Sequence, residues 1–213
     1  MMTERATNPN ASYCQPKLCI CWVLAALLAS STTRAQDPAE IPVFKISQED
    51  SSVKFNVKAS VAIAGAFDKW DASLTFTSPD VTTGVLSVNI QADSVNTGSG
   101  MKDGKLKSKK FFDAEHNPSI TFISKKIVQT GSDTFDVEGD FTIRGVTKPE
   151  TLKLTVSGKG TGSGEVMGTM VFDRKQYGMN SGIPFIKIAD RVEVSVVLKG
   201  KRVSGPPLAF SPI

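Results

Sequence analysis

FDVEGDFTIRGVTKPETLKLTV, residues 135–156, contains two consecutive runs in which apolar and polar side chains alternate. The apolar members of these runs are Phe135, Val137, Phe141 and Ile143, followed by Leu152, Leu154 and Val156. A period of two is typical of a β-strand with one apolar and one hydrated face. The intervening Thr147-Lys148-Pro149 is typical of a turn, so this stretch predicts two strands separated by a turn.

The same alternation extends over most of the chain. Further runs occupy residues 53–58, 73–77, 86–93 and 192–199, and weaker ones occupy residues 119–128 and 166–173. Turn residues separate them at 78–80, 131–133 and 158–164. About eight antiparallel strands indicate an all-β domain, either a sandwich or a closed barrel. Closure is the attractive alternative because it leaves no sheet edge exposed, and an eight-stranded barrel has room for one small ligand.

One segment favours a helix instead. Between Met101 and Phe112, Leu106 and the pair Phe111-Phe112 are spaced to share a helix face. The segment also carries five lysines, which form either a basic rim that meets an anionic headgroup or membrane surface, or an ordinary hydrated face. They are Lys102, Lys105, Lys107, Lys109 and Lys110.

The N-terminus is typical of a secretory signal peptide. The unbroken apolar run Leu18–Ala29 follows Lys17, is too short to span a bilayer, and leads into small and polar residues ending at Ala35. We therefore expect residues 1–35 to be a signal peptide cleaved after Ala35, and the mature protein to be periplasmic or secreted. The three cysteines, Cys14, Cys19 and Cys21, would be lost with it.

Composition restricts the function classes. Of 213 residues, 40% are hydrophobic and 22% are charged, and the formal net charge is +4. The chain is therefore ordinary globular material, with too little excess charge to indicate a nucleic-acid binder. One histidine, His116, and no cysteine after residue 21 leave little from which to build a metal site, so we expect no metal and no cofactor.

Several motifs occur in a characteristic order. They are SVKFNVK (52–58), GAF (65–67), DSVNT (93–97), DGKLKS (103–108) leading to FFD (111–113), NPSITF (117–122), GDFTIRGVTKP (139–149) and DRKQYGM (173–179). In this order they resemble the YceI-like family of bacterial periplasmic proteins, from about Phe44 to Arg202. The resemblance implies an extended, lipocalin-like antiparallel β-barrel of about eight strands with one short helix. It also implies that a polyisoprenoid or similar long lipid is carried or stored in an elongated apolar cavity. One departure is the absence of the histidine that many members carry soon after the first strand, since residues 57–60 here read VKAS.

The domain organisation expected from these observations is a loose leader at 36–43, a YceI-like barrel at 44–203 and a flexible tail at 204–213. Large inward side chains either line a cavity or fill the core. The candidates for the cavity lining are Phe55, Phe67, Trp70, Phe76, Val88, Ile90, Phe111, Phe112, Phe122, Phe141 and Phe172. Arg144 and Arg174, each in a family motif beside a turn, are candidates for binding a lipid headgroup.

The expected function is that of a non-enzymatic binding protein that sequesters, stores or carries a polyisoprenoid or similar lipid. No serine lies in a nucleophile motif, and we predict no catalytic residue. We expect neither a nucleic-acid partner nor stable insertion into a membrane. One alternative is a structural or stress-related envelope protein with a filled barrel. The other is a lipid isomerase or cyclase, which would need a polar group facing the interior.

Overall fold

The computed structural model describes residues 41–60, 63–182 and 187–212, in which ten strands form one antiparallel sheet. The predicted signal peptide and most of the predicted leader lie outside the described residues. The sheet order is β3-β4-β6-β7-β8-β9-β10-β1-β2-β5. The strands are β1 (Val43–Ala59), β2 (Ile63–Phe67), β3 (Trp70–Thr75), β4 (Val85–Gln91), β5 (Val95–Asn96), β6 (Ser119–Gln129), β7 (Thr134–Ile143), β8 (Val146–Ser157), β9 (Ser163–Asp173) and β10 (Ile188–Ser204).

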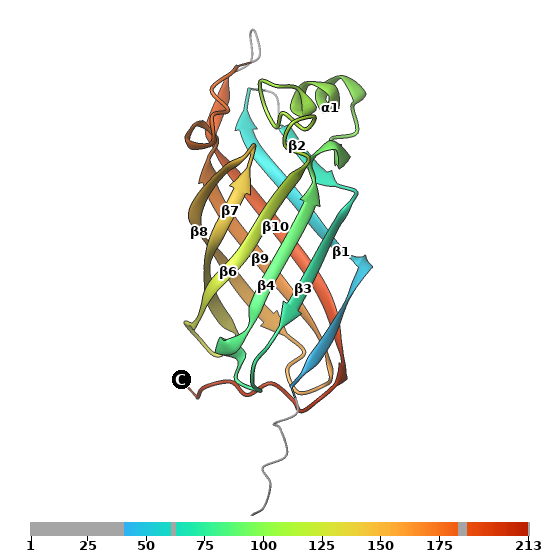
Figure 1. Ribbon diagram of the computed structural model, residues 1–213, viewed down its shortest axis with the longest axis vertical. Helices are drawn as coiled ribbons and strands as arrows, with labels where there is room; N and C mark the ends of the chain where they lie inside the picture. Colours follow the sequence, from blue (N-terminus) through green and yellow to red (C-terminus); the bar gives the residue numbers. More distant parts are fainter. Residues whose placement is uncertain (1–40, 61–62, 183–186, 213) are drawn as a thin grey trace, which may run out of the picture. The chain divides into compact units, whose positions relative to one another are not determined.

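The sheet curls into a barrel, with α1 (Gly100–Lys107) at one end (Figure 1). The sheet closes where its first strand, β3, comes to lie beside β1; β2 and β3 are consecutive in the chain, with Asp68 and Lys69 between them. β2 pairs with β1 and β5, whereas β3 pairs with β4. β3 also lies beside β1, where one side-chain hydrogen bond, from Gln48 Nε2 to the Trp70 carbonyl (2.8 Å), takes the place of a ladder. This architecture confirms the predicted all-β barrel with one short helix.

Two short strands raise the strand number above the expected eight. β2 reads IAGAF and has small side chains on its outer face, so it lacks the alternation by which the other strands are recognised. β5 is two residues long, too short to show a period at all. Both strands lie beyond β1 at one end of the sheet order, where they complete the barrel wall.

The turn between β7 and β8 is not at Thr147–Pro149, where the sequence predicted it, but at Arg144 and Gly145. Ile143 pairs directly with Val146, and the two residues between them have φ of 55° and 71°. Two successive positive φ values define the tight hairpin turn that fits the twist of the flanking strands, and glycine adopts such a φ readily. Pro149 lies inside β8 because pairing of β8 with β9 begins only at Lys153, which leaves Pro149 on a free edge.

The predicted helix is shorter than expected. α1 ends at Lys107, and Ser108 is already extended, with its amide and hydroxyl both donating to the Lys105 carbonyl. Phe111 and Phe112 follow in a turn, where the Phe112 amide donates to the Leu106 carbonyl (2.9 Å). The chain therefore folds back under its own helix and directs both rings into the end of the barrel.

Alternating side chains of the strands meet inside the barrel in one apolar cluster. On β7, for example, Phe135, Val137, Phe141 and Ile143 are all buried. The segment after β10, expected to be flexible, crosses the end of the barrel opposite α1, where Leu208 and Phe210 pack against the cluster. Among the described residues, no helix is both long enough and apolar enough to cross a membrane.

Candidate functional site

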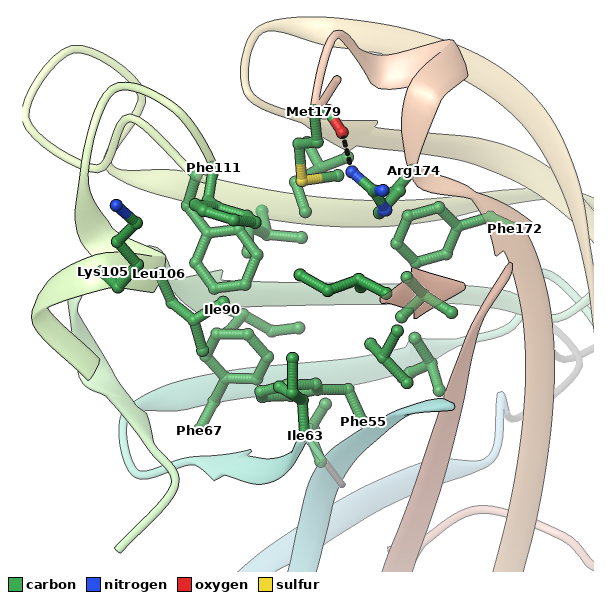
Figure 2. Close-up of a pocket in the computed structure, with 18 of the residues that line it drawn as sticks. Phe55, Ile63, Phe67, Ile90, Lys105, Leu106, Phe111, Phe172, Arg174 and Met179 are labelled. Carbon is green, nitrogen blue, oxygen red and sulfur yellow. Dashed lines mark hydrogen bonds between the residues drawn. The ribbon is translucent and has the colours of Figure 1, made fainter. Parts of the chain in front are cut away.

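The barrel contains a cavity of about 120 Å³ at the end covered by α1, which we call the helix-end cavity. Its walls come from β1, β2, β4, β6, β7, β9 and β10 and from the segment around α1 (Figure 2). It is lined by Val53, Phe55, Val57, Ile63, Phe67, Ile90, Lys102, Lys105, Leu106, Phe111, Phe112, Ile120, Phe141, Ile143, Phe172, Arg174, Met179, Ile188, Val192 and Val194. The lining is apolar apart from three cationic side chains.

One wall of the helix-end cavity consists of three phenylalanine rings. Phe55 on β1 and Phe67 on β2 lie 5.6 Å apart between ring centroids, and Phe112 packs on both at 6.4 and 5.9 Å. Gly65 makes this cluster possible, because a Cβ at that position would come within 2.8 Å of the Phe55 ring. The spacing of the rings is that of favourable aromatic pairs.

A second aromatic cluster joins Phe141, Phe172 and Tyr177, with centroid distances of 5.0 to 5.5 Å. Tyr177, in the short 3-10 helix η3 (Arg174–Tyr177), is completely buried, and its hydroxyl donates to Glu150 Oε1 (2.8 Å). Burial, together with the adjacent carboxylate, raises the pKa of Tyr177 far above its ordinary value. The phenol therefore stays protonated and serves as a fixed hydrogen-bond donor behind the cavity wall.

The mouth of the helix-end cavity lies beside α1. Leu106 points from α1 into the cavity, whereas the Lys105 side chain extends away from it (Figure 2). The helix is anchored by Asp103, whose carboxylate accepts from the Thr97 amide (2.8 Å) and hydroxyl (2.6 Å). These hydrogen bonds, the hydroxyl's first, lower the pKa of Asp103. Lys102 and Lys105 are the two positively charged side chains that α1 contributes to this otherwise apolar opening.

Arg174 lines the helix-end cavity but is already occupied by the protein. Its guanidinium donates to the carbonyls of Ala189 (3.1 Å), Met179 and Ser181 (3.0 Å) and to the Asp190 carboxylate (3.2 Å). Four of the five N–H groups of an arginine are therefore used. The side chain is buried, so its observed role is to hold the chain on either side of the cavity mouth.

Arg144, the other headgroup candidate, does not line the helix-end cavity. From the β7–β8 turn it donates to the carbonyls of Gly178 (2.6 Å) and Lys109 (2.9 Å). It thereby ties the segment after α1 to the segment after η3. Both predicted arginines are thus engaged by the protein itself: Arg144 binds backbone carbonyls, and Arg174 binds backbone carbonyls and the Asp190 carboxylate.

The structure distributes the eleven predicted lining residues over three places. Seven line the helix-end cavity, namely Phe55, Phe67, Ile90, Phe111, Phe112, Phe141 and Phe172. Phe76 lines a second cavity at the opposite end, the tail-end cavity, which encloses about 120 Å³. Val88 and Phe122 line neither cavity and are buried between them, and Trp70 is half-buried at the start of β3 and also lines neither.

The two cavities have no lining residue in common, and a layer of side chains that we call the belt lies between them. It takes one buried residue from each of six neighbouring strands, β4 and β6 to β10: Val88, Phe122, Val137, Leu152, Met170 and Val196. Along β7, Phe135 lines the tail-end cavity and Phe141 the helix-end cavity, with Val137 between them. Gly139 leaves room for Phe122, whose ring would lie 2.8 Å from a Cβ there.

Sequence reasoning missed several lining residues. Ile63 belongs to the weakly patterned β2, and Met179 follows η3 outside any strand. The motif DRKQYGM ends at Met179, so its position in the series of motifs was the one available signal. Val53, Val57 and Val192 did show the inward alternation, but alternation alone does not distinguish a cavity wall from filled core.

His116 is exposed and hydrogen-bonds Asp113 (2.9 Å). In the described ranges, no group of three or more histidine, cysteine, aspartate or glutamate side chains is arranged to hold a metal ion.

An antiparallel barrel with a helix over one end and an apolar cavity beneath that helix defines the lipocalin-like class of β-barrels. Within this class, the chain belongs to the YceI-like domain family, whose sequence model matches residues 44–200. The match extends over nearly the whole described barrel and confirms the resemblance read from the motifs.

Among curated proteins, the chain is similar to proteins named UPF0312. The one from Pseudomonas savastanoi pv. phaseolicola is 35% identical over 98 residues, which are 46% of this chain and 51% of the relative. The chain therefore spans about half the length of that relative. The one from Pseudomonas aeruginosa is 32% identical over 141 residues, 64% of this chain and 73% of the relative.

Two solved structures share the fold. BcnA of Burkholderia cenocepacia has a TM-score of 0.66 at 26% identity, covering 73% of this chain and 99% of that protein. A polyisoprenoid binding domain from Saccharophagus degradans has a TM-score of 0.61 at 18% identity, covering 76% and 99%. The second similarity establishes the fold alone.

Proposed function

We propose that this protein is an exported, non-enzymatic binding protein that holds an apolar lipid of the isoprenoid type in the helix-end cavity. The observation that carries the proposal is the lining of this cavity, which is apolar throughout except for Lys102, Lys105 and Arg174. An apolar chain gains about 0.8 kcal/mol for each CH₂ group removed from water. Affinity can therefore come from the chain itself, and the two lysines at the mouth suit an anionic headgroup.

The polyisoprenoid binding domain of S. degradans, which shares the fold, supports the isoprenoid class. Membership of the YceI-like family, together with the fold shared with that binding domain, supports binding rather than catalysis.

The free space in the helix-end cavity limits what enters without rearrangement. An apolar cavity of about 150 Å³ holds one benzene molecule, so 120 Å³ corresponds to about one five-carbon isoprenoid unit. A longer chain requires side chains at the mouth to turn aside. Met179 and Leu106 lie there, and methionine adapts its shape readily.

Mass spectrometry of an organic extract from freshly purified protein tests the proposal directly. We expect an isoprenoid lipid in the extract, and saturable binding when the emptied protein is titrated with prenyl alcohols of increasing length. Val194→Phe, which fills the helix-end cavity, should abolish this binding, whereas the exposed substitution Val171→Ala on the outside of β9 should preserve it. An extract without lipid, together with no saturable binding, would refute the proposal.

A second candidate function is a structural role with a filled barrel, and the belt is the observation that favours it. Six buried side chains lie between the two cavities in the middle of the barrel. That candidate predicts no bound lipid, so the same extract and titration distinguish the two.

Export is part of the proposal and has its own test. N-terminal sequencing of the mature protein should give Gln36 as the first residue. A mature chain that retains Cys14, Cys19 and Cys21 would refute cleavage at this position.

A further inference from the structure

The tail-end cavity is lined entirely by apolar side chains. Its lining is Phe44, Ile46, Leu74, Phe76, Val81, Leu86, Ile127, Phe135, Leu154, Val156, Gly164, Val166, Leu198, Gly200, Leu208 and Phe210. No side chain in this set carries a hydrogen-bonding or charged group. A buried water needs two to four polar partners, so a site of this kind stays dry and accommodates hydrocarbon instead.

The tail-end cavity is separated from the helix-end cavity by the belt. The belt residues are buried to at least nine-tenths, and Val137 is completely buried. A ligand that enters beside α1 therefore meets packed side chains before it reaches the tail-end cavity. Access from the opposite end is governed by different residues.

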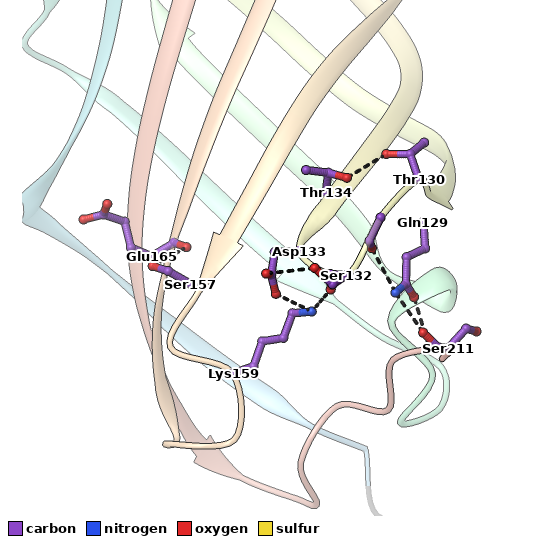
Figure 3. Close-up of polar contacts among 10 residues, drawn as sticks. Gln129, Thr130, Ser132, Asp133, Thr134, Ser157, Lys159, Glu165 and Ser211 are labelled. Atoms are coloured by element: carbon purple, nitrogen blue, oxygen red, sulfur yellow. Dashed lines mark hydrogen bonds and ion pairs between the residues drawn. The ribbon is translucent and has the colours of Figure 1, made fainter. Parts of the chain in front are cut away.

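The C-terminal segment 205–212, which we call the strap, crosses that opposite end (Figure 1). Its Ala209 amide donates to the Pro79 carbonyl (2.8 Å), and its Ala209 carbonyl accepts from the Val81 amide (3.1 Å). Farther along, the Ser211 backbone is held by two reciprocal hydrogen bonds with the Gln129 side chain (3.0 and 2.9 Å; Figure 3). These few contacts position Leu208 and Phe210 over the cavity.

A cation also covers the strap. Lys159 Nζ lies 4.3 Å from the centroid of the Phe210 ring and forms an ion pair with Asp133 (2.8 Å) and a hydrogen bond to the Ser132 carbonyl. An ammonium over a phenylalanine face is attractive. None of these contacts belongs to a ladder between two strands of the sheet. The strap can therefore leave the end of the barrel while the sheet stays intact.

We propose that the tail-end cavity is a second, independent binding site for a small uncharged hydrocarbon of about five or six carbon atoms, admitted when the strap moves aside. The size of the ligand follows from the cavity volume of about 120 Å³. That the ligand is uncharged follows from the apolar lining. The phenyl rings of Phe44, Phe76, Phe135 and Phe210 favour an aromatic or compact branched molecule over a long chain. This inference does not depend on lipid binding in the helix-end cavity.

Titration of the full mature chain with benzene, followed by methyl NMR, tests the proposal because each cavity has its own reporters. Leu74, Leu86 and Leu198 report on the tail-end cavity, and Val57, Ile63 and Val192 on the helix-end cavity. We expect saturable shifts of the tail-end methyls. Val166→Phe should lower the affinity measured there about tenfold or more and leave the helix-end methyls as in the unsubstituted protein.

Val194→Phe is the matched control, since Val194 is equally half-buried but lines the helix-end cavity. It should preserve the tail-end shifts. Absence of saturable tail-end shifts in the unsubstituted protein would overturn the proposal, and this outcome needs no variant. Loss of both sets of shifts in both folded variants would also overturn it, because the cavities would then be one continuous site.

The strap itself is tested by the rate at which benzene leaves. Gln129→Ala removes both hydrogen bonds to Ser211 without changing the cavity lining. It should increase the dissociation rate about threefold to tenfold, because a more weakly held strap opens more often and each opening lets bound benzene leave. Gln176→Ala, an exposed glutamine in η3 beside the helix end, should leave the rate unchanged. Equal rates in the two variants would show that the strap does not control access.

Discussion

Arg174 illustrates how one side chain organises the cavity mouth. Its guanidinium binds three carbonyls and one carboxylate from residues that follow η3. We predict that Arg174→Ala lowers the free energy of unfolding by about 2–4 kcal/mol, because buried hydrogen bonds to a charged donor are strong and their acceptors would be left without it. Urea denaturation measures this loss. Arg191→Ala, at an exposed position on β10, should stay within about 0.5 kcal/mol of the unsubstituted protein.

A small effect of Arg174→Ala on stability combined with a large loss of lipid affinity would contradict this assignment. It would instead identify Arg174 as the headgroup ligand that its motif first indicated.

His116 provides a pH-dependent signal that is simple to assign, because it is the one histidine in the chain. Its hydrogen bond to Asp113, reinforced by the charges of Asp113 and Glu115, raises the pKa of His116 above its ordinary value. Since the folded state favours the protonated form, the contribution to stability is complete below the ordinary histidine pKa and is lost as pH rises through the raised one. An NMR titration should show the raised pKa, and Asp113→Asn should return it toward the ordinary value. An unchanged pKa in that variant would contradict the role of Asp113.

At the scale of single elements, β7 shows why glycine occurs inside a buried strand. A Cβ at Gly139 would lie 2.5 Å from the Ile123 carbonyl oxygen and 2.8 Å from the Phe122 ring. We predict that Gly139→Ala destabilises the protein by about 1–3 kcal/mol, as overpacking does. Gly104→Ala is the control, because it adds a methyl group in open space on α1 and should stabilise by up to about 1 kcal/mol. Thermal unfolding of the two variants compares them, and similar melting temperatures would contradict the packing argument.

The elements differ in how far they could be predicted from sequence. β7 alternates along its length and was located correctly, whereas the run at 192–199 identified only the central part of β10. β2 and β5 lack a period, and the turn after β7 was misplaced because Pro149 resembles a turn residue when its free edge is not known. The end of α1 depends on Phe111 and Phe112 folding beneath it, which is a tertiary contact that helix periodicity does not contain.

The belt shows what could not be predicted from sequence about the candidate site. Val88, Phe122 and Ile90 all follow the same inward alternation, yet the first two close the barrel and the third lines a cavity. Which of these outcomes applies depends on the tilt of the strands and on how far each side chain reaches across the barrel. Those quantities arise only when the whole sheet is assembled.

At the scale of the molecule, the belt divides the barrel interior into two compartments. We predict that Phe122→Ala connects them at a stability cost of about 3–5 kcal/mol. For prenyl alcohols of increasing length, affinity for the unsubstituted protein should stop rising once the helix-end cavity is filled. In the variant it should rise further, with about 3–4 kcal/mol of gross burial for each added five-carbon unit.

Ile123→Ala, at the exposed neighbouring position on β6, should retain the length dependence of the unsubstituted protein. If Phe122→Ala shows that same dependence while remaining folded, the belt is not what limits the chain.

The line along which β3 lies beside β1 has a mechanical consequence. Elsewhere around the barrel, neighbouring strands are connected by ladders, of which β7–β8 and β9–β10 run without a register shift, and widening the barrel there would break several backbone hydrogen bonds at once. Between β1 and β3, the Gln48 side chain is the hydrogen-bonded connection. Any increase in circumference is therefore concentrated at this one line. The barrel is therefore stiff where its ladders are long and compliant along the line between β1 and β3.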